Sequence, residues 1–452
     1  MFQSLGCPRN FVDTEVMLGL AVQNGLEVTQ DSAEADYLVV NTCGFLQTAR
    51  DESSDAILQL LNEKRPNSKL LVTGCMVNLH KEQILKTYPE VDKVLGSGKV
   101  DKVMEAIREL NLGENHKEYI DHDHKEERKS FLEQGDTPRF LATPPHYAYL
   151  KIAEGCRKRC SFCIIPKIKG RLQSKPIDQV VEEFQALLET GASEIILIAQ
   201  DLGDYGKDMG LRKTGLASLL RALLDSNPGD FWLRLLYLYP DEITPEVIEI
   251  IQNDKRILRY LDMPLQHIND KMLKAMKRTT TSADIKSTIQ QLRDRLPGIQ
   301  IRTSLMVGFP GETEEDFQEL LEFVEEYRLD NVGVFKYSNE ELAWSSKLDN
   351  HVDEDVKEDR YHRLMQAQLH VIEEKNRSLV DQQERFEVVI EGLHPEHENV
   401  IVGRHYGQCP DIDGQVLITD IDDLNGQMPR PGARYLVEVT DYDHYDLIGR
   451  IV

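Results

Sequence analysis

The sequence predicts an α/β protein in three parts: an N-terminal parallel-sheet α/β domain, a central partial barrel of six βα repeats, and a small C-terminal antiparallel β-barrel. The first two parts are predicted because apolar runs of strand length alternate with stretches of helix length, as in parallel sheets covered by helices. Short alternating segments punctuated by Gly and Pro predict the third. A chain of 452 residues is also too long for one ordinary core.

Residues 1–112 are the expected N-terminal domain. Three apolar runs each end at a cysteine beside a glycine: QSLGC at Cys7, YLVVNTCG at Cys43 and KLLVTGC at Cys75. Helical patterns lie at Asp13–Gln23, Thr48–Asn62 and Lys99–Leu110. Because the carboxyl ends of parallel strands share one edge, we expect the three cysteines to converge there. Ordinary buried cysteines are the alternative. The first strand is short, so we expect an incomplete sheet edge or a start further upstream.

Residues 113–137 are expected to be a charged linker, because GENHKEYIDHDHKEERKSFLEQGD shows almost no apolar periodicity. His122 and His124 lie in this acidic run. We interpret both as solvated side chains and not as metal ligands.

Residues 138–382 are the expected central domain. Six segments predict its strands: Tyr149–Ala153, Glu194–Asp201, Phe231–Pro240, Arg259–His267, Ile299–Gly311 and Asn331–Ser338. Helical patterns separate them at Ile177–Thr190, Leu216–Ser226, Pro245–Asn253, Thr281–Arg295 and Glu314–Tyr327, and a charged helix pattern, Val356–Gln382, leads to the tail. Such repeats predict an open version of the eight-stranded parallel barrel. Polar residues at its strand ends are expected around the mouth, with helix or loop capping as the alternative role of each: Gln200, Asp201, Gln266, His267, Arg302 and Thr303.

Three cysteines follow the first of these strands, at Cys156, Cys160 and Cys163. The spacing C-x3-C-x2-C gathers three thiolates around one small volume, which suits zinc or an iron–sulfur cluster. The next forty residues offer no cysteine or histidine as a fourth ligand. Three ligands on a four-iron cluster leave one iron open for a substrate or cofactor. Three thiols without a metal are the alternative.

Composition limits the class of protein. The formal net charge is −25, which disfavours a bare nucleic-acid binder and suits a basic partner. Seven cysteines without secretory context predict a reducing compartment, here the cytoplasm. No apolar run approaches the roughly eighteen residues of a membrane span, and no leader pattern is visible, so we expect neither a membrane span nor a signal peptide.

The central motif, with Phe162 directly before its last cysteine, resembles the signature of radical S-adenosylmethionine enzymes. The resemblance implies that S-adenosylmethionine chelates the open iron of a 4Fe–4S cluster and is cleaved by one electron. The turn GFPGETEEDF, Gly308–Phe317, resembles the adenine-side motif of that family, and its Thr313 and Asp316 resemble a capping box. The side chains and glycines that we expect to contact the cofactor are Phe162, Gln200, Gln266, Arg302, Gly308 and Gly311.

The tail, residues 383–452, resembles the TRAM domain, and the order of the motifs is similar to methylthiotransferases over nearly the full length. That resemblance implies that Cys7, Cys43 and Cys75 hold a second 4Fe–4S cluster tied to sulfur delivery. It further implies two S-adenosylmethionine per turnover, one as methyl donor and one as radical source. A low-potential electron donor such as flavodoxin or ferredoxin is implied as well. We interpret Cys409 as structural.

The resemblance implies one of two main bacterial choices of substrate. SLGCPRNFVDTE, TPPHYAYLKIAEGC, CIIPKIKG and CPDIDGQV look closest to the members that modify the β-carbon of an aspartate in small-subunit ribosomal protein twelve. The alternative is a tRNA adenosine. From Phe386 to Val452 the tail has 13 Asp plus Glu against 4 Lys plus Arg, a net charge of −9, whereas phosphate binding needs the opposite sign. Direct nucleic-acid binding is therefore not expected. A third reading is a non-catalytic metal-cluster protein that docks on basic partners, although a binding module needs no open iron.

Overall fold

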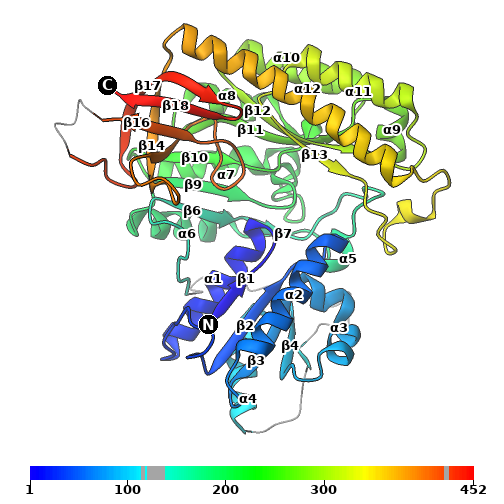
Figure 1. The fold of residues 1–452 in the computed structure, drawn as a ribbon, viewed down its shortest axis with the longest axis vertical. Helices are drawn as coiled ribbons and strands as arrows, with labels where there is room; N and C mark the ends of the chain where they lie inside the picture. Colours follow the sequence, from blue (N-terminus) through cyan, green and yellow to red (C-terminus); the bar gives the residue numbers. More distant parts are fainter. Residues whose placement is uncertain (113–117, 120–137, 422–426) are drawn as a thin grey trace.

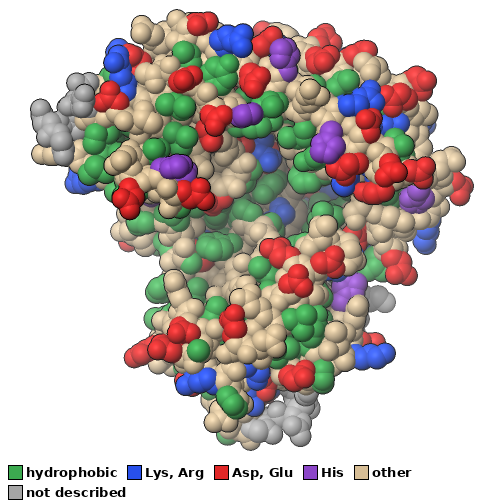
Figure 2. Space-filling model, viewed as in Figure 1, with side chains coloured by type: hydrophobic (Ala, Val, Ile, Leu, Met, Phe, Trp, Pro, Cys, Tyr) green, Lys and Arg blue, Asp and Glu red, His purple; other side chains and the backbone are tan. Residues whose placement is uncertain are grey.

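A computed structural model describes residues 1–112, 118–119, 138–421 and 427–452 of the chain. Figure 1 shows the N-terminal domain at one end, the central sheet in the middle, and the C-terminal barrel against the central sheet. The surface is hollowed between the N-terminal domain and the other two domains (Figure 2). No helix of the described part combines the length and apolar character needed to cross a membrane.

The N-terminal domain is a five-stranded parallel sheet in the order β1-β2-β3-β4-β5. Its strands are β1 (Phe2–Ser4), β2 (Tyr37–Thr42), β3 (Lys69–Gly74), β4 (Lys93–Gly96) and β5 (Glu118–Tyr119). Its helices are α1 (Pro8–Gln23), α2 (Gln47–Glu63), α3 (Cys75–Thr87) and α4 (Val103–Leu112). Alternate residues of β2 and β3 enter two separate apolar clusters, one on each face of the sheet, so both faces are covered.

Three elements of this domain, α3, β4 and β5, are missing from the sequence prediction. Helix α3 begins at Cys75 directly after β3, so no turn residues separate the strand signal from the helix signal. Strand β4 has only four residues. Of the expected linker, residues 113–137, only β5 is described, and it pairs with β4. His122 and His124 lie outside the described residues.

The central domain contains all six predicted strands, in one open sheet of order β13-β12-β11-β10-β9-β6. All of its ladders are parallel. The strands are β6 (Tyr147–Lys151), β9 (Glu194–Ile198), β10 (Trp232–Leu235), β11 (Ile257–Gln266), β12 (Gln300–Val307) and β13 (Asn331–Lys336). The helices are α5 (Ile165–Ile168), α6 (Ile177–Glu189), α7 (Gly215–Ser226), α8 (Pro245–Asn253), α9 (Asp270–Ala275), α10 (Ser282–Arg295), α11 (Glu314–Tyr327) and α12 (Glu354–Asp381). This confirms the partial (β/α)6 barrel.

The C-terminal domain is a closed barrel of order β14-β15-β16-β18-β17. Its strands are β14 (Arg385–Leu393), β15 (Ile401–His405), β16 (Val416–Asp420), β17 (Arg434–Asp443) and β18 (Asp446–Ile451). The barrel that the sequence predicts is confirmed, with two differences. Strand β15 is an additional strand, and β16 pairs with β18 in parallel, so the barrel is not antiparallel throughout.

The two faces of the central sheet are covered by different parts of the chain. Helices α6, α7, α8, α10 and α11 pack on one face. On the other face, Tyr149, Ile196 and Tyr260 form a cluster with Val12 of α1 and with Cys409 of the C-terminal domain. Cys409 is fully buried there, in agreement with the structural role expected for it. The inner face of the open barrel is thus filled by the two flanking domains.

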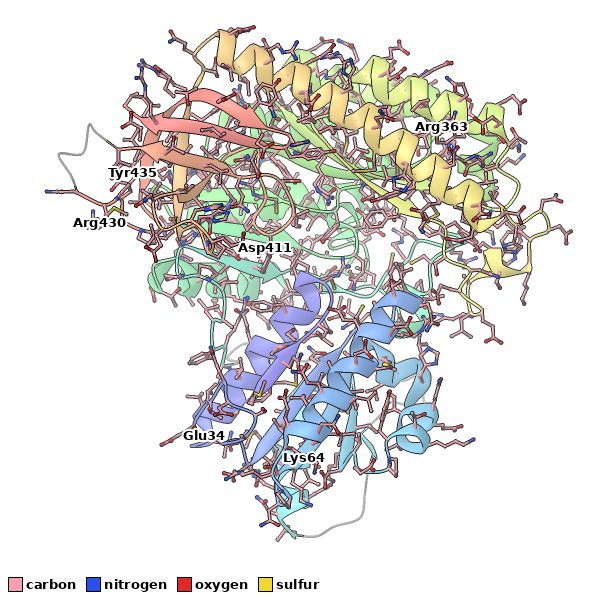
Figure 3. The ribbon with its side chains drawn as sticks, viewed as in Figure 1. Glu34, Lys64, Arg363, Asp411, Arg430 and Tyr435 are labelled. Atoms are coloured by element: carbon pink, nitrogen blue, oxygen red, sulfur yellow. The ribbon has the colours of Figure 1, made fainter. Side chains whose placement is uncertain are left out.

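Buried ion pairs fix the C-terminal barrel on this face. Glu194 accepts from Arg234 Nε at 2.6 Å and from Arg404 Nη2 at 2.9 Å, and all three side chains are buried. Arg404 also pairs with Glu391 at 2.5 Å. Asp411, on the loop after β15, accepts from the Tyr147 hydroxyl at 3.0 Å and lies between the barrel and the sheet (Figure 3). Charge pairing at this depth selects one docking geometry, because any other leaves a buried charge unpaired.

We predict that Arg404→Met destabilises the protein by about 3 kcal/mol, because Glu194 and Glu391 then lose a buried cation. Arg450→Met is the matched control, because Arg450 is half exposed and its partner Glu438 keeps a second cation, Arg385. It should cost far less. Urea denaturation measures both variants, and equal losses would contradict the docking role of Arg404.

Candidate active site

The loop between β7 (Ala153–Glu154) and β8 (Gln173–Ser174) carries the three central cysteines, and these two short strands pair antiparallel and close it. The amide of Cys156 donates to Gly170 O at 3.2 Å, and the amide of Ser161 donates to Met276 O at 3.0 Å. Gly155 has φ of 74°, and a Cβ there would lie 2.1 Å from the carbonyl oxygen of Arg171. The loop is therefore held at its start and in its middle.

The three central thiols line one cavity of about 1100 Å³. Burial raises the pKa of Cys156 to about 11 and that of Cys163 to about 12. Cys160 Sγ lies 3.5 Å from Arg278 Nη1 and 3.8 Å from the Tyr239 hydroxyl. Thiols so buried are poor free nucleophiles and become thiolates when a metal binds them.

The separation of the sulfurs bears on the type of metal. In the described part of the chain, one group of three His, Cys, Asp or Glu residues has all its ligand atoms within 4.8 Å of one another. The three residues of that group are carboxylates. Neither cysteine trio is therefore that compact. Tetrahedral zinc, with Zn–S of about 2.3 Å, places its sulfurs about 3.8 Å apart. In neither trio do all three sulfurs lie at that spacing in this structure.

The structure brings the N-terminal cysteines to one sheet edge, where the topology predicts them. Cys7 is the N-cap residue of α1, Cys43 follows β2, and Cys75 opens α3. A Cβ on Gly6 would lie 2.8 Å from Cys43 Cβ, and one on Gly44 would lie 2.8 Å from the Cys75 carbonyl carbon. Only glycine allows the three loops to approach this closely. The roles of the six cysteines as metal ligands stay a prediction.

Arg9 lies between the two cysteine trios. Its Nη1 donates to Ala199 O at 2.6 Å, at the end of β9, and its guanidinium lies 4.8 Å from the ring centroid of Tyr237. Burial by itself would raise the pKa of Cys7, but the nearby charge of Arg9 brings it below its usual value. The same charge also lowers the pKa of Cys163, against the larger effect of burial. One cation of the N-terminal domain thus acts on both trios.

A closed ring of four buried charges joins the same two domains. Asp13 of α1 pairs with Lys151 of β6 and, at 3.1 Å, with Lys169. Glu154 of β7 pairs with Lys151 at 2.8 Å and with Lys169 at 3.0 Å. Each carboxylate faces two ammonium groups, and the two lysines overcome burial and lower the pKa of Glu154 to about 2. The ring starts two residues before Cys156 and therefore fixes α1 beside the central cysteine loop.

Two of the strand-end residues have buried polar atoms without a partner in the described part of the chain. Both amide atoms of Gln200 are shielded and unpaired, and so is Nε2 of His267. Burial lowers the pKa of His267 to about 3, so the imidazole is neutral. Buried polar atoms are normally hydrogen-bonded, so a ligand or water is needed to complete these two. Gln200, at the end of β9 beside Arg9, fits the expected contact with a polar cofactor.

Three further strand-end residues have structural partners. Asp201 accepts from the Gly203 amide at 3.0 Å, and Thr303 donates to Met263 O at 2.6 Å. Arg302 pairs with Asp262 and with Asp413 of the C-terminal domain, both at 3.2 Å. These contacts give Asp201, Thr303 and Arg302 polar partners within the protein. The expected contact of Arg302 with the cofactor stays a prediction. Gln266 ends β11 with φ of 73°.

The turn after β12 packs against the cysteine loop. Phe162 contacts the apolar cluster that contains Phe309, Met276 and Tyr337. Gly308 and Gly311 have φ of 75° and 85°, a conformation that favours glycine. The turn is closed by Glu312, which accepts from the amides of Gly308 and Phe309. The capping box of Thr313 and Asp316 at the start of α11 is confirmed.

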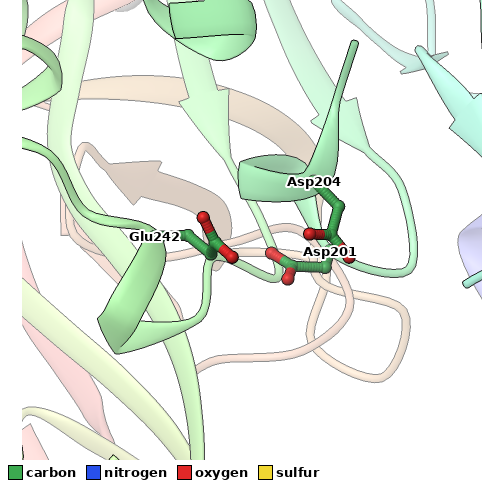
Figure 4. Close-up of side chains that lie close together, drawn as sticks. All are labelled: Asp201, Asp204 and Glu242. Carbon is green, nitrogen blue, oxygen red and sulfur yellow. The ribbon is translucent and has the colours of Figure 1, made fainter. Parts of the chain in front are cut away.

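The structure contains a cluster of buried charges next to the cysteine loop that the sequence analysis did not predict. We call it the charged cage. Asp201, Asp204 and Glu242 point toward one another, as Figure 4 shows. The place of a cation between them is taken by Lys158, at 3.2 Å from Asp201 and 2.9 Å from Glu242, and by Lys207, at 2.8 Å from Asp204 and 2.5 Å from Glu242. Burial raises the pKa of Asp201 to about 7. The one sequence feature that could have indicated this cage is Lys158, in the middle of CRKRC.

Comparison with known proteins gives three matches along the chain. Residues 1–96 match the uncharacterized protein family UPF0004, residues 150–324 match the Radical SAM superfamily, and residues 384–452 match the TRAM domain. The chain is 51% identical to the ribosomal protein uS12 methylthiotransferase RimO of Protochlamydia amoebophila, over 100% of this chain and 92% of that protein. It is 44% identical to the RimO protein of Geotalea uraniireducens, over 99% of this chain and 97% of that protein.

Among solved structures, the radical S-adenosylmethionine methyltransferase TsrM of Kitasatospora setae, with cobalamin and a [4Fe-4S] cluster bound, is similar in fold. The TM-score is 0.54 at 15% identity, over 74% of each chain. This likeness supports the fold of the central domain.

We predict that the chain binds about eight iron atoms and that alanine at any of the six cysteines of the two trios removes about half of them. Cys409→Ala is the matched control, because this cysteine is buried in the domain contact and should lose no iron. Iron and sulfide analysis after anaerobic reconstitution measures this. Bound zinc in place of iron, or equal iron loss in the control, would contradict the assignment.

We further predict that Lys158→Met releases iron roughly tenfold faster to a chelator, equivalent to about 1.4 kcal/mol. Without Lys158, three buried carboxylates share only Lys207 and repel one another, which loosens the loop between Cys156 and Cys160. Lys158→Arg keeps the charge and should recover most of the retention. Identical rates in wild type and Lys158→Met would show that the cage does not support the loop.

Proposed function

The chain belongs to the radical S-adenosylmethionine methylthiotransferase family, and we propose that it attaches a methylthio group to the β-carbon of an aspartate in ribosomal protein uS12. It is a radical S-adenosylmethionine enzyme with S-adenosylmethionine and 4Fe–4S chemistry as its cofactors. The observation that carries the substrate is that relatives 41–51% identical over the full length are named for uS12. We place the reaction in the cytoplasm, where ribosomal proteins are assembled.

We propose that the two cysteine trios hold two clusters with separate tasks. When bound, the cofactors supply a one-electron cleavage that removes hydrogen from an unactivated carbon, and a methyl group for the transferred sulfur. Cys156, Cys160 and Cys163 would hold the cluster that binds S-adenosylmethionine, with Gln200 as a polar contact. Cys7, Cys43 and Cys75 would hold the cluster for sulfur delivery, and two S-adenosylmethionine would be used per turnover.

The residues of this chain favour transfer between the two sites. The ring of Asp13, Lys151, Glu154 and Lys169 holds the N-terminal domain against the central one, so the two trios lie on either side of one domain contact. Arg9 supplies a cation between them, which suits an anionic sulfur in transit.

Charge supports a basic protein substrate over tRNA. Four of the five basic side chains of the barrel are in ion pairs: Arg385 and Arg450 with Glu438, Arg404 with Glu194, and Arg434 with Asp230. Arg430 is the fifth and has no ion pair in the described part of the chain. The barrel therefore offers few free cations to phosphates, and its net charge of −9 attracts a basic protein.

We predict that the reconstituted enzyme, given S-adenosylmethionine and dithionite, adds one methylthio group to uS12 and none to hypomodified tRNA offered in the same reaction. Mass spectrometry of both products measures this, and the modified uS12 residue should be an aspartate. The same mass gain on a tRNA adenosine would overturn the substrate. Cofactor cleavage without gain on either would keep the family and discard both substrates.

The cysteine variants test the division of tasks in the same assay. Cys156→Ala should abolish formation of 5′-deoxyadenosine, whereas Cys7→Ala should keep that cleavage and lose methylthio transfer. Equal loss of cleavage in both variants would contradict two separate tasks.

A further inference from the structure

Exposed cations surround the mouth of the central cysteine cavity, although the chain as a whole carries −25. We call this set of side chains the basic rim: Arg157, Arg159, Lys167, Arg171, Lys277 and Lys347, all exposed. Exposed carboxylates in the lining of this cavity are those of Asp208 and Glu341. The local charge is therefore opposite to that of the whole molecule.

The basic rim is not consumed by internal contacts. In the described part of the chain, Arg159, Arg171 and Lys347 form no ion pair, and Arg157 approaches Asp204 only to 4.0 Å. Lys167 donates to the carbonyl oxygen of Leu342 at 2.6 Å. Lys158, by contrast, points inward and pairs with Asp201 and Glu242 of the charged cage. Arg157 and Arg159 on either side of it therefore remain available to a partner.

An apolar patch lies within the rim. Leu342 and Trp344 are 40% and 49% exposed, and both line the cavity. Lys277 Nζ lies 3.9 Å from the ring centroid of Trp344. An exposed tryptophan among cations is typical of a protein-binding surface, because aromatic residues and arginine dominate the energy of interfaces.

The cavity inside the basic rim is lined by only part of the proposed reaction site. Its lining contains all three central cysteines but none of Gln200, Gln266, Gly308 and Gly311, and none of the N-terminal cysteines. The cysteine loop thus has one side toward the strand ends and another side toward solvent, through the rim. A partner on the rim therefore lies next to the loop that carries the central cysteines.

We propose that the basic rim, with Leu342 and Trp344, is the docking surface for a small acidic electron-carrier protein of the flavodoxin or ferredoxin type. Cleavage of S-adenosylmethionine by this family requires one electron from outside. The reduced carrier loses one electron, and the cluster held by the three thiolates would gain it. In this transfer step no bond is formed or broken and no proton is transferred. The inference rests on family membership and not on the identity of the methylthiolated substrate.

Charge decides between the partners that could use this surface. A basic ribosomal protein is repelled by six exposed cations, whereas an acidic carrier is attracted, and its association rate rises by steering. Electron-transfer complexes are small and transient, burying less than about 1200 Å² in total. A rim around one cavity with two apolar side chains at its centre suits a contact of that size.

The test compares Arg171→Glu/Lys347→Glu with a matched control, Lys86→Glu/Lys255→Glu. The control makes the same change in net charge at exposed lysines, one in α3 and one between α8 and β11. Flavodoxin is the probe, and its binding to the reconstituted enzyme is measured by surface plasmon resonance. Formation of 5′-deoxyadenosine is measured with reduced flavodoxin and, separately, with dithionite, which needs no docking surface.

We expect the rim variant to raise the dissociation constant for flavodoxin roughly tenfold and to slow the flavodoxin-driven reaction at limiting carrier, more so at low ionic strength. Its dithionite-driven rate should equal that of wild type, and the control should match wild type in every measurement. Trp344→Ala should weaken flavodoxin binding with no change in charge.

Three outcomes would overturn the proposal. Unchanged flavodoxin binding in the rim variant would place the carrier elsewhere. An equal loss of the dithionite-driven rate would assign the rim to support of the cysteine loop. Unchanged flavodoxin binding together with lost retention of a single-stranded RNA oligonucleotide would assign the rim to phosphate binding.

Discussion

The arrangement of the candidate site depends on the buried ring of Asp13, Lys151, Glu154 and Lys169. Each carboxylate contacts two ammonium groups, so four charges neutralise one another where water is excluded. Removing any one leaves an uncompensated buried charge, which is strongly destabilising. Because Asp13 belongs to the helix that begins after Cys7, and Glu154 precedes Cys156, the ring brings two cysteine trios from separate domains together.

The same principle of paired buried charges positions the C-terminal barrel. Glu194, Arg234 and Arg404 join the barrel to the inner face of the central sheet, and Arg302 with Asp262 and Asp413 adds a second contact. Most basic side chains of the barrel are used in this way or in surface pairs, which leaves an acidic domain beside the hollow. Six exposed cations lie around the central cysteine cavity. This separation of charge agrees with the proposal of one surface for a basic substrate and another for an acidic electron carrier.

Much of the fold was predictable because its elements are long and repeat regularly. All six central strands and the capping box at Thr313 were predicted, since continuous apolar runs and cap residues are local signals. Helix α3 and strands β4 and β15 were missed. The first follows a strand without an intervening turn, and the two strands have only four and five residues. The parallel pairing of β16 with β18 involves strands that are not consecutive, so no local pattern indicates it.

The sequence by itself determined the chemistry of this protein. The spacing of Cys156, Cys160 and Cys163 and the cysteines at the ends of three predicted strands can be seen directly in the sequence. Because the strands are parallel, the three strand-end cysteines lie at one edge of the sheet. The tertiary structure alone decided which charges are paired. Lys158 with Asp201 and Glu242, Arg302 with Asp413, and Arg9 between the two trios each join residues tens to hundreds of positions apart. The physical reason is that Coulomb interactions depend on separation and burial, and neither is encoded in the spacing along the chain.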